Sequence, residues 1–578
     1  MNAAASAAAV AVVASLSVAV GVFGLRTART TRDFYLASRT VTPRWNAAAV
    51  GGEYLSAASF LGVAGLVLAY GYDALWYPVG YTAGYLLLLA VVSAPLRRSG
   101  AYTLPDFAEI RMGSRAVRRV AAVLVVVIGW VYLVPQLQGA GLTLAAQTGA
   151  PRWLGMVLVG TVVLVAATVA GMRSITFTQA LQYWLKFIAL LIPAVVLLGV
   201  WQHRHDGIGT GYPVAAADIT VAIHADETVH LPADRTITVR GSVDGVAANG
   251  PVLLTAGDHR LSAGSSVVLR AGDIVPVVDS LPARSNAEWL SPLGSGQRHP
   301  LYSVLSLTLG ICLGTMGLPH ILVRFYTNPD GRDARRTTII VIVLLSLFYL
   351  LPTLLGVFGR HYAADLLVTG DTDATVLLLP ERMIGGTAGA ALGALVTAGA
   401  FAAFLSTASG LTVSVAGVLS QEILREPRFR LRPHRIRAFR AAAVVSVLVP
   451  IALASSEVHL GLAAVVGLAF TIAASTFCPL LVLGVWWPRL TVPGALAGLL
   501  TGGVLSTTAA VVTLVSGGAG GWSGALLAQP AAWVVPVTFA VMITVSKLTP
   551  LRVPGDTHRI MARLHIPDPE PAVNRSSR

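Results

Sequence analysis

Long apolar runs, separated by short polar or basic connections, dominate the sequence. A bilayer-spanning helix needs about 20 mostly apolar residues, and about 13 segments meet this requirement. They lie near residues 6–25, 46–70, 74–96, 118–146, 153–172, 178–201, 301–325, 337–360, 388–422, 439–456, 460–487, 491–516 and 531–548. The pattern predicts an all-α polytopic membrane protein, and an odd number of spans places its two ends on opposite sides.

Residues 202–298 depart from this pattern. They contain alternating runs such as "DITVAIHADETVHL" and "DRTITVRGSVDG", and alternation of apolar and polar residues is typical of half-buried strands. We therefore expect a small β-rich insert that folds as a unit, with its role left open. The expected parts are transmembrane helices one to six in 1–201, the insert in 202–298, helices seven to thirteen in 299–548 and a tail in 549–578.

Composition and charge agree with a membrane protein. The 578 residues are 55% hydrophobic and 12% charged, which excludes an ordinary soluble domain. Arg and Lys number 41 against 27 acids, for a net charge of +14. Because the basic residues gather in alternate short connections such as "RFYTNPDGRDARRTT", we interpret the charge as a topology signal rather than a nucleic-acid surface.

The topology signal predicts an orientation. Short cytoplasmic loops collect Arg and Lys, so the N-terminus and the insert should lie outside the plasma (cytoplasmic) membrane and the C-terminus in the cytoplasm. The first apolar segment has its Arg residues after the apolar run, unlike a cleavable signal peptide. We expect it to remain as a membrane helix.

Two of the apolar segments contain residues that interrupt a membrane helix. "YLSAAS", residues 54–59, places Ser56 and Ser59 inside the second span, and "LTLGICLGTMGLPHILVRFY", residues 307–326, contains three glycines and Pro319. Non-helical backbone at membrane depth persists where it lines an enclosed cavity. Helix packing by small residues is the alternative explanation of either segment alone.

The two interrupted segments lie at matching positions of two halves, helices two to six and helices seven to eleven. Such a pair is the best sequence indication of a transporter built from inverted repeats, with substrate held between the broken helices. The N-termini of half-helices carry partial positive charge and favour an anionic substrate group.

Several strings in the chain resemble the sodium:solute symporter family, and within it the cation/acetate (monocarboxylate) symporters. They are "DFYLASR", "YLSAASFLG", "AYGYD", "GLPHILVRFYTNPDGRDARR", "FLSTASGLTVSVAGVLSQEI" and "VGLAFTIAASTFCPLL". The resemblance implies a leucine-transporter-like core in helices two to eleven, one leading helix and alternating access driven by a sodium gradient. It does not extend to the insert.

The resemblance also implies a sodium site between helices two and nine. Its ligands would be backbone carbonyls and two hydroxyls, at Gly52, Leu55, Ala403, Ser406 and Thr407. Neutral oxygen ligands suit a monovalent ion that must also leave, although hydroxyls on membrane helices also bond to neighbouring helices or to their own backbone. The two hydroxyls favour sodium over protons as the coupling ion.

The substrate would lie between the two breaks, held by hydroxyls and backbone amides. The residues expected there are Ser56, Ala57, Ser59, Thr315, Gly317 and His320, with Glu53 as a candidate coupling residue. An intramembrane carboxylate is a functional candidate by default, and a position in the cytoplasmic vestibule is the alternative for Glu53. For His320 a structural role beside Pro319 is the main alternative.

For several other polar residues we expect mainly structural or surface roles. We expect Arg324 to be an anchor at the cytoplasmic boundary, and Gln136 either to line the cavity or to bond to a neighbouring helix. The insert's His224, His230 and His259 lack metal-ligand spacing, so we expect a solvated surface there.

The resulting hypothesis is a symporter of sodium and a small monocarboxylate such as acetate, propionate or pyruvate, with no cofactor. The alternatives are a sodium-coupled symporter of an amino acid or sugar, proton-coupled monocarboxylate uptake, and a membrane nutrient sensor. An enzyme is not expected, because neither "GxSxG" nor "HExxH" occurs. The expected partners are the bilayer, sodium and the carboxylate, and a small membrane accessory subunit is left open.

Overall fold

The structure is a computed structural model. It describes residues 3–24, 41–169, 172–204, 207–293, 299–424, 432–455, 461–516 and 521–566. The "DFYLASR" string, the basic connection around it and the last part of the tail lie outside the described residues.

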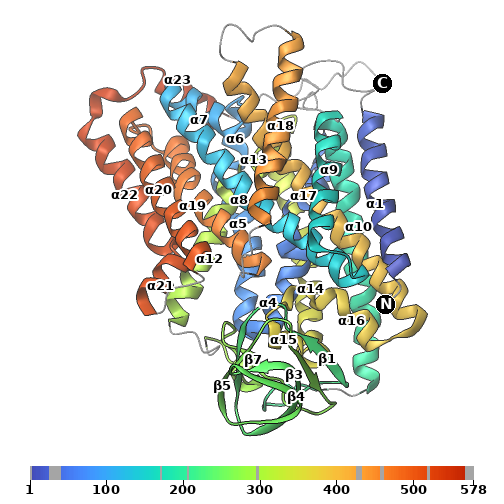
Figure 1. Cartoon of the computed structure of the whole chain (residues 1–578). Coiled ribbons are helices and arrows are strands. Elements are labelled where there is room, and N and C mark those ends of the chain that lie inside the picture. Colours follow the sequence, from blue (N-terminus) through green and yellow to red (C-terminus); the bar gives the residue numbers. More distant parts are fainter. Residues whose placement is uncertain are drawn as a thin grey trace.

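Most of the described chain forms helices of one bundle (Figure 1). Those before the sheet are α1 (Ala3–Gly24), α3 (Pro43–Tyr54), α4 (Val63–Tyr70), α5 (Trp76–Val91), α6 (Ser93–Arg98), α7 (Leu104–Met112), α8 (Arg115–Thr148), α9 (Arg152–Val169) and α10 (Met172–Arg204). Those after it are α11 (Asn286–Leu290), α12 (Pro300–Gly317), α13 (Pro319–Phe325), α14 (Gly331–Tyr362), α15 (Leu366–Thr369), α16 (Thr375–Met383), α17 (Gly386–Leu424), α18 (Arg432–Ala454), α19 (Leu462–Trp486), α20 (Val492–Ser516), α21 (Gly521–Ala528), α22 (Ala531–Leu548) and α23 (Thr557–His565).

Within the described residues, 11 helical stretches are long and apolar enough to cross a membrane. One of them, Ala58–Val91, contains both α4 and α5, and α9 is a further, shorter apolar helix. The expectation of an all-α polytopic membrane protein is therefore confirmed.

Both interrupted segments are broken helices. In the second span, α3 ends at Tyr54 and the backbone is not helical at Leu55 and Ser56. The chain then forms a π-helical turn, Ala58–Gly62, that leads into α4. The second break lies at Leu318, where the backbone is extended between α12 and α13. Pro319 explains this break, because proline cannot donate a helical hydrogen bond and disfavours the α conformation in the preceding residue.

The insert is a curled antiparallel sheet. Its strands are β1 (Ile219–Ala222), β2 (Glu227–Leu231), β3 (Arg235–Val243), β4 (Val246–Leu254), β5 (Gly257–Leu261), β6 (Ser266–Leu269) and β7 (Val277–Val278). The order is β1-β6-β3-β5-β2-β7, with β4 paired to β3. Asp244 and Gly245 turn the β3–β4 hairpin with positive φ at both residues, as two-residue hairpin loops require.

The insert is joined through α11 to the end of the first broken helix. The Trp289 indole nitrogen donates to the carbonyls of Val67 and Leu68, at 2.6 and 3.1 Å, and Arg360 also donates to Leu68. These donors satisfy carbonyls that the C-terminus of α4 leaves without a helical partner. Gly71 has a φ of 61° and a side chain there would meet the Trp289 carbonyl at 1.9 Å, so glycine is required at this contact.

Figure 1 shows how the ends of the bundle differ. The sheet and the start of α1 lie at one end, and α6, α7 and α23 lie at the other. This arrangement agrees with an N-terminus and insert on the same side. Which end faces the cytoplasm remains a prediction from the positions of the basic connections.

Candidate functional site

The first helix break exposes backbone carbonyls that face α10 and α17. The Ser406 hydroxyl donates to the Gly52 carbonyl at 2.7 Å and lies 3.0 Å from the Ala403 carbonyl. The Thr407 hydroxyl donates to the Glu53 carbonyl at 2.7 Å. The break therefore brings together oxygens of Gly52, Ala403, Ser406 and Thr407, four of the residues that the family resemblance implies for a sodium site.

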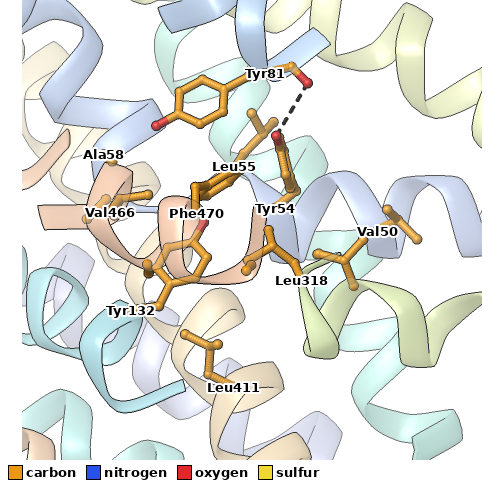
Figure 2. Packing of buried hydrophobic residues seen from close by; sticks show 14 of the residues in the cluster. Val50, Tyr54, Leu55, Ala58, Tyr81, Tyr132, Leu318, Leu411, Val466 and Phe470 are labelled. Carbon is orange, nitrogen blue, oxygen red and sulfur yellow. Dashed lines mark hydrogen bonds between the residues drawn. The ribbon is translucent and has the colours of Figure 1, made fainter. Parts of the chain in front are cut away.

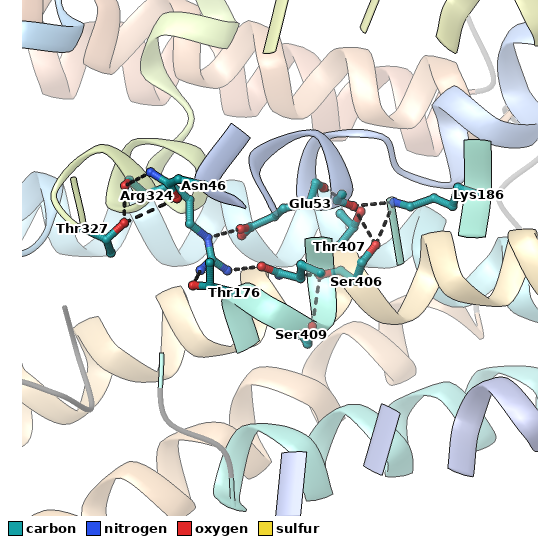
Figure 3. A network of polar contacts seen from close by, with 11 residues as sticks. Asn46, Glu53, Thr176, Lys186, Arg324, Thr327, Ser406, Thr407 and Ser409 are labelled. Carbon is teal, nitrogen blue, oxygen red and sulfur yellow. Dashed lines mark hydrogen bonds and ion pairs between the residues drawn. The ribbon is translucent and has the colours of Figure 1, made fainter. Parts of the chain in front are cut away.

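A lysine side chain enters the same group of oxygens. The Lys186 ammonium group, from the middle of α10, donates to the Leu55 carbonyl at 2.7 Å and to the Gly52 carbonyl. It also donates to the Ser406 hydroxyl at 2.9 Å (Figure 3). Lys186 is fully buried. Sequence analysis missed this residue, although a single lysine inside an apolar span was a usable signal.

Small residues allow these helices to approach closely. A Cβ at Gly52 would lie 2.1 Å from the Gln179 carbonyl of α10, and one at Gly410 would lie 1.9 Å from a carboxylate oxygen of Glu53. Glycine at both positions lets α3 pack directly against α10 and α17. This packing places the carbonyls of the first break within reach of the lysine.

Glu53 and Arg324 form a buried ion pair, with 2.6 Å between the guanidinium and the carboxylate. Arg324 also donates to the Thr176 hydroxyl at 2.9 Å and to the Gln179 side chain, and Gln179 donates to the Ser406 carbonyl at 2.9 Å (Figure 3). We expected Arg324 to be an anchor at the cytoplasmic boundary, but its side chain is buried and pairs with Glu53. The break at Leu318 turns this arginine inward, toward the carboxylate of the other broken helix.

The residues expected to hold substrate are all buried, and several already have partners. The Ala57 amide donates to the Gln136 side chain at 2.8 Å, and the hydroxyls of Ser59 and Tyr349 lie 2.9 Å apart. The Thr315 hydroxyl lies 2.7 Å from that of Tyr54. Gln136 thus bonds to the neighbouring broken helix, and the Thr315 contact joins the two broken helices.

Aromatic rings that sequence analysis did not assign fill the region between the breaks. Phe470 of α19 makes edge contacts with Tyr54, Tyr81 and Tyr132, with ring centroids 5.9, 5.3 and 5.8 Å apart (Figure 2). The apolar pattern could not select these rings, because α5, α8 and α19 meet only in the tertiary structure.

Two groups of buried polar atoms in this region have no hydrogen-bond partner within the described residues. They include the hydroxyls of Ser56, Tyr81 and Tyr85 and both ring nitrogens of His320. The His320 ring contacts Tyr132 edge to face at 5.2 Å. Since a buried donor without a partner costs about 1–3 kcal/mol, these atoms mark places where a polar ligand would be stabilised.

A small pocket lies next to the second break. Glu53, His320 and Arg324 line it together with residues of α17 and the connection before α7. Those elements place it toward the end of the bundle opposite the sheet (Figure 1). Gly317 does not line it; a Cβ there would lie 2.5 Å from the Ala473 carbonyl of α19, so this glycine permits close helix packing.

The histidines of the sheet only partly match the expected solvated surface. His224 is exposed, but His259 is buried and bonds to Asp244 at 2.7 Å and to the Thr255 carbonyl at 2.8 Å. Burial disfavours protonated His259, but these two acceptors outweigh burial and raise its pKa. No cluster of metal-ligating side chains occurs within the described residues.

Two broken helices that pack together within a bundle of apolar spans define a secondary transporter of the inverted-repeat class. A solved structure of a Na+-coupled sialic acid symporter in an outward-open state has the same fold, with a TM-score of 0.61 and 14% identity over 95% of this chain and 98% of that one. The chain belongs to the sodium:solute symporter family, whose model matches residues 34–209 and 253–502.

Curated relatives extend over most of the chain. An uncharacterized symporter of Cupriavidus necator is 29% identical, covering 90% of this chain and 88% of the relative. An uncharacterized symporter of Bacillus subtilis, YwcA, is 28% identical, covering 85% of this chain and 82% of the relative. The residues between the two family-model matches, 210–252, lie in the insert and include β1, β2 and β3.

Proposed function

We propose that this symporter carries a small monocarboxylate into the cell, driven by an inward cation gradient and by alternating access. The observation that carries the proposal is the set of unpartnered donors at Tyr81, Tyr85 and His320 within an apolar, aromatic region. A carboxylate offers two strong acceptor oxygens, and a short alkyl chain fits against aromatic rings. Acetate, propionate and pyruvate have these properties.

A neutral solute such as an amino acid or sugar is the second candidate. It would need several more donors and acceptors around its polar groups, because each unmatched polar group is costly in a buried site. The partners of Ser59 and Thr315 are other protein hydroxyls, which leaves few groups for such a solute. The arrangement therefore favours the carboxylate.

The test is uptake of labelled pyruvate into proteoliposomes that contain the full chain, under imposed sodium, proton or combined gradients. Unlabelled acetate, propionate, butyrate, alanine and glucose serve as competitors. The proposal expects competition by the short carboxylates only. Competition by alanine or glucose, with none by the carboxylates, would reject it.

A single hydroxyl provides a sharper version of this test. Tyr85→Phe removes only the unpartnered hydroxyl of a fully buried ring. A hydrogen bond to a charged group contributes about 1.5–3 kcal/mol, so the half-saturating carboxylate concentration should rise about tenfold or more. Tyr212→Phe, at an exposed tyrosine before the sheet, is the matched control and should leave it unchanged.

A further inference from the structure

The Lys186 side chain occupies the position that a coupling cation would take. Its ammonium group donates to the carbonyls of Gly52 and Leu55 and to the hydroxyl of Ser406. These are three of the five ligands that the family resemblance implies for sodium. An ammonium group and a sodium ion both need such oxygens within contact distance, so one position cannot hold the two cations together.

The carbonyls of the first break need a cation or a donor, and the lysine meets that need. A break in a membrane helix leaves carbonyls without helical partners, and such groups must find partners inside the protein. Lys186 satisfies Gly52 and Leu55, and a hydroxyl of α17 satisfies Glu53. The ammonium group thus takes the place of a bound metal ion in joining the broken helix to α10 and α17.

The charged groups around Lys186 do not neutralise it by direct contact within the described residues. α10 packs against α1, α3, α14, α16 and α17, and α16 carries Glu381 and Arg382 near its end. α1 carries no ionisable residue, α17 carries only Glu422, and α14 presents Tyr349 between its charged ends. On α3, Glu53 interacts electrostatically with Lys186, but its carboxylate pairs with Arg324.

Two opposing effects act on the charge of this lysine. A buried ammonium group without a contacting carboxylate is costly to keep charged, while the three oxygen acceptors favour the charged form. The neutral amine can still donate two of the three hydrogen bonds. Glu53 lines the pocket that lies toward the end opposite the sheet, so a charged partner of Lys186 borders a space that water can occupy.

We propose that Lys186 is the built-in cation of this site and that uptake is coupled to a proton, which Lys186 carries, instead of to sodium. The ammonium group holds α3, α10 and α17 together in one state of the transporter. Breaking one N–H bond releases a proton to the cytoplasmic side and leaves a neutral amine, which weakens this junction; the amine takes up a proton from outside to complete the cycle. The inference deepens the proposed function by naming its coupling ion.

The first test needs no transport substrate and measures sodium binding by thermal unfolding of the purified full chain. A ligand that binds only the folded state raises the melting temperature. Replacing choline chloride with sodium chloride at equal ionic strength should leave wild type unchanged. Lys186→Ala frees the carbonyls and hydroxyls and should acquire a saturable rise in melting temperature with sodium.

The control for this test is Lys547→Ala. Lys547 is exposed at the end of α22 and is the other lysine of the chain, so its variant should match wild type. A saturable sodium-dependent rise in wild type would overturn the proposal. If Lys186→Ala does not fold, Lys186→Gln replaces it, because glutamine keeps a hydrogen-bond donor near the carbonyls.

The second test measures labelled pyruvate in proteoliposomes with an alkaline interior and no sodium, with protein-free liposomes as the blank. Wild type should accumulate pyruvate. The accumulation by Lys186→Gln should be at least about tenfold lower, although this variant should still exchange pyruvate without a gradient. Lys186→Arg keeps the charge but cannot release the proton, so it should also lose accumulation. Unchanged accumulation in both variants would overturn the proposal.

The two tests separate this inference from the proposed function. Absence of carboxylate transport under every gradient would reject the carboxylate substrate, while the thermal unfolding test still decides whether Lys186 excludes sodium. Conversely, carboxylate uptake that requires sodium in wild type would support the substrate and reject the role of Lys186.

Discussion

The buried pair between Glu53 and Arg324 allows a quantitative prediction. Arg324→Met removes the guanidinium group and keeps an apolar side chain in its place. The charges are 2.6 Å apart and the two side chains are 1% and 2% exposed. Their attraction is about 6 kcal/mol at an effective dielectric constant of about 20, and desolvation offsets part of this. Removing one partner should therefore cost about 3–5 kcal/mol of stability.

The pair also predicts how two substitutions combine. Glu53→Gln alone leaves the Arg324 charge buried and should destabilise the protein, as Arg324→Met should. The double variant removes both charges, so its loss should be smaller than the sum of the two single losses by about 1–3 kcal/mol. Arg152→Met breaks an ion pair whose side chains are 54% and 40% exposed, and it should cost at most about 1 kcal/mol.

The assay is thermal unfolding of the purified full chain with a fluorogenic thiol-reactive dye. Both cysteines, Cys312 and Cys478, are buried, so the dye reacts as the protein unfolds. Melting temperatures of the single, double and control variants form the cycle. Additive losses, or an Arg324→Met loss no larger than that of Arg152→Met, would refute the reasoning.

Three further predictions concern separate parts of the molecule. Ala57→Leu adds bulk beside the first break and should abolish inhibition of uptake by propionate before that by acetate, whereas Ala9→Leu on α1 should be nearly silent; an unchanged chain-length series would place the substrate elsewhere. Trp289→Phe removes a hydrogen-bond donor to the carbonyls at the end of α4 and should cost about 1 kcal/mol of stability. The loss should appear as faster hydrogen exchange at the Leu68 amide, and unchanged exchange would contradict a stabilising role of Trp289. The raised pKa of His259 means that its protonated form stabilises the sheet. The protection of strand amides against hydrogen exchange, corrected for the intrinsic exchange rate, should therefore fall as pH rises above about 6.5. His259→Gln should flatten that dependence, and an equal pH response in both proteins would contradict the prediction.

The sequence alone predicted the bundle and its breaks because both depend on local chemistry. An apolar stretch long enough to span a bilayer must satisfy its backbone hydrogen bonds as a helix. Pro319 ends a helix wherever it lies, and "YLSAAS" supplied the small and polar residues that a break tolerates. The strands of the insert followed equally directly from alternation along the chain.

The partners at the breaks were decided only by tertiary structure. Glu53 and Arg324 are far apart in the sequence, and an arginine near a basic loop has the same local pattern whether it lies at a boundary or turns inward. Lys186 is likewise a single charge on a long apolar helix, and its contact with the carbonyls of the first break depends on how α10 packs against α3. That packing requires Gly52, where any side chain would collide with the α10 backbone. Local pattern fixes which segments are helices, whereas the distances between side chains on different helices depend on close packing of the whole bundle.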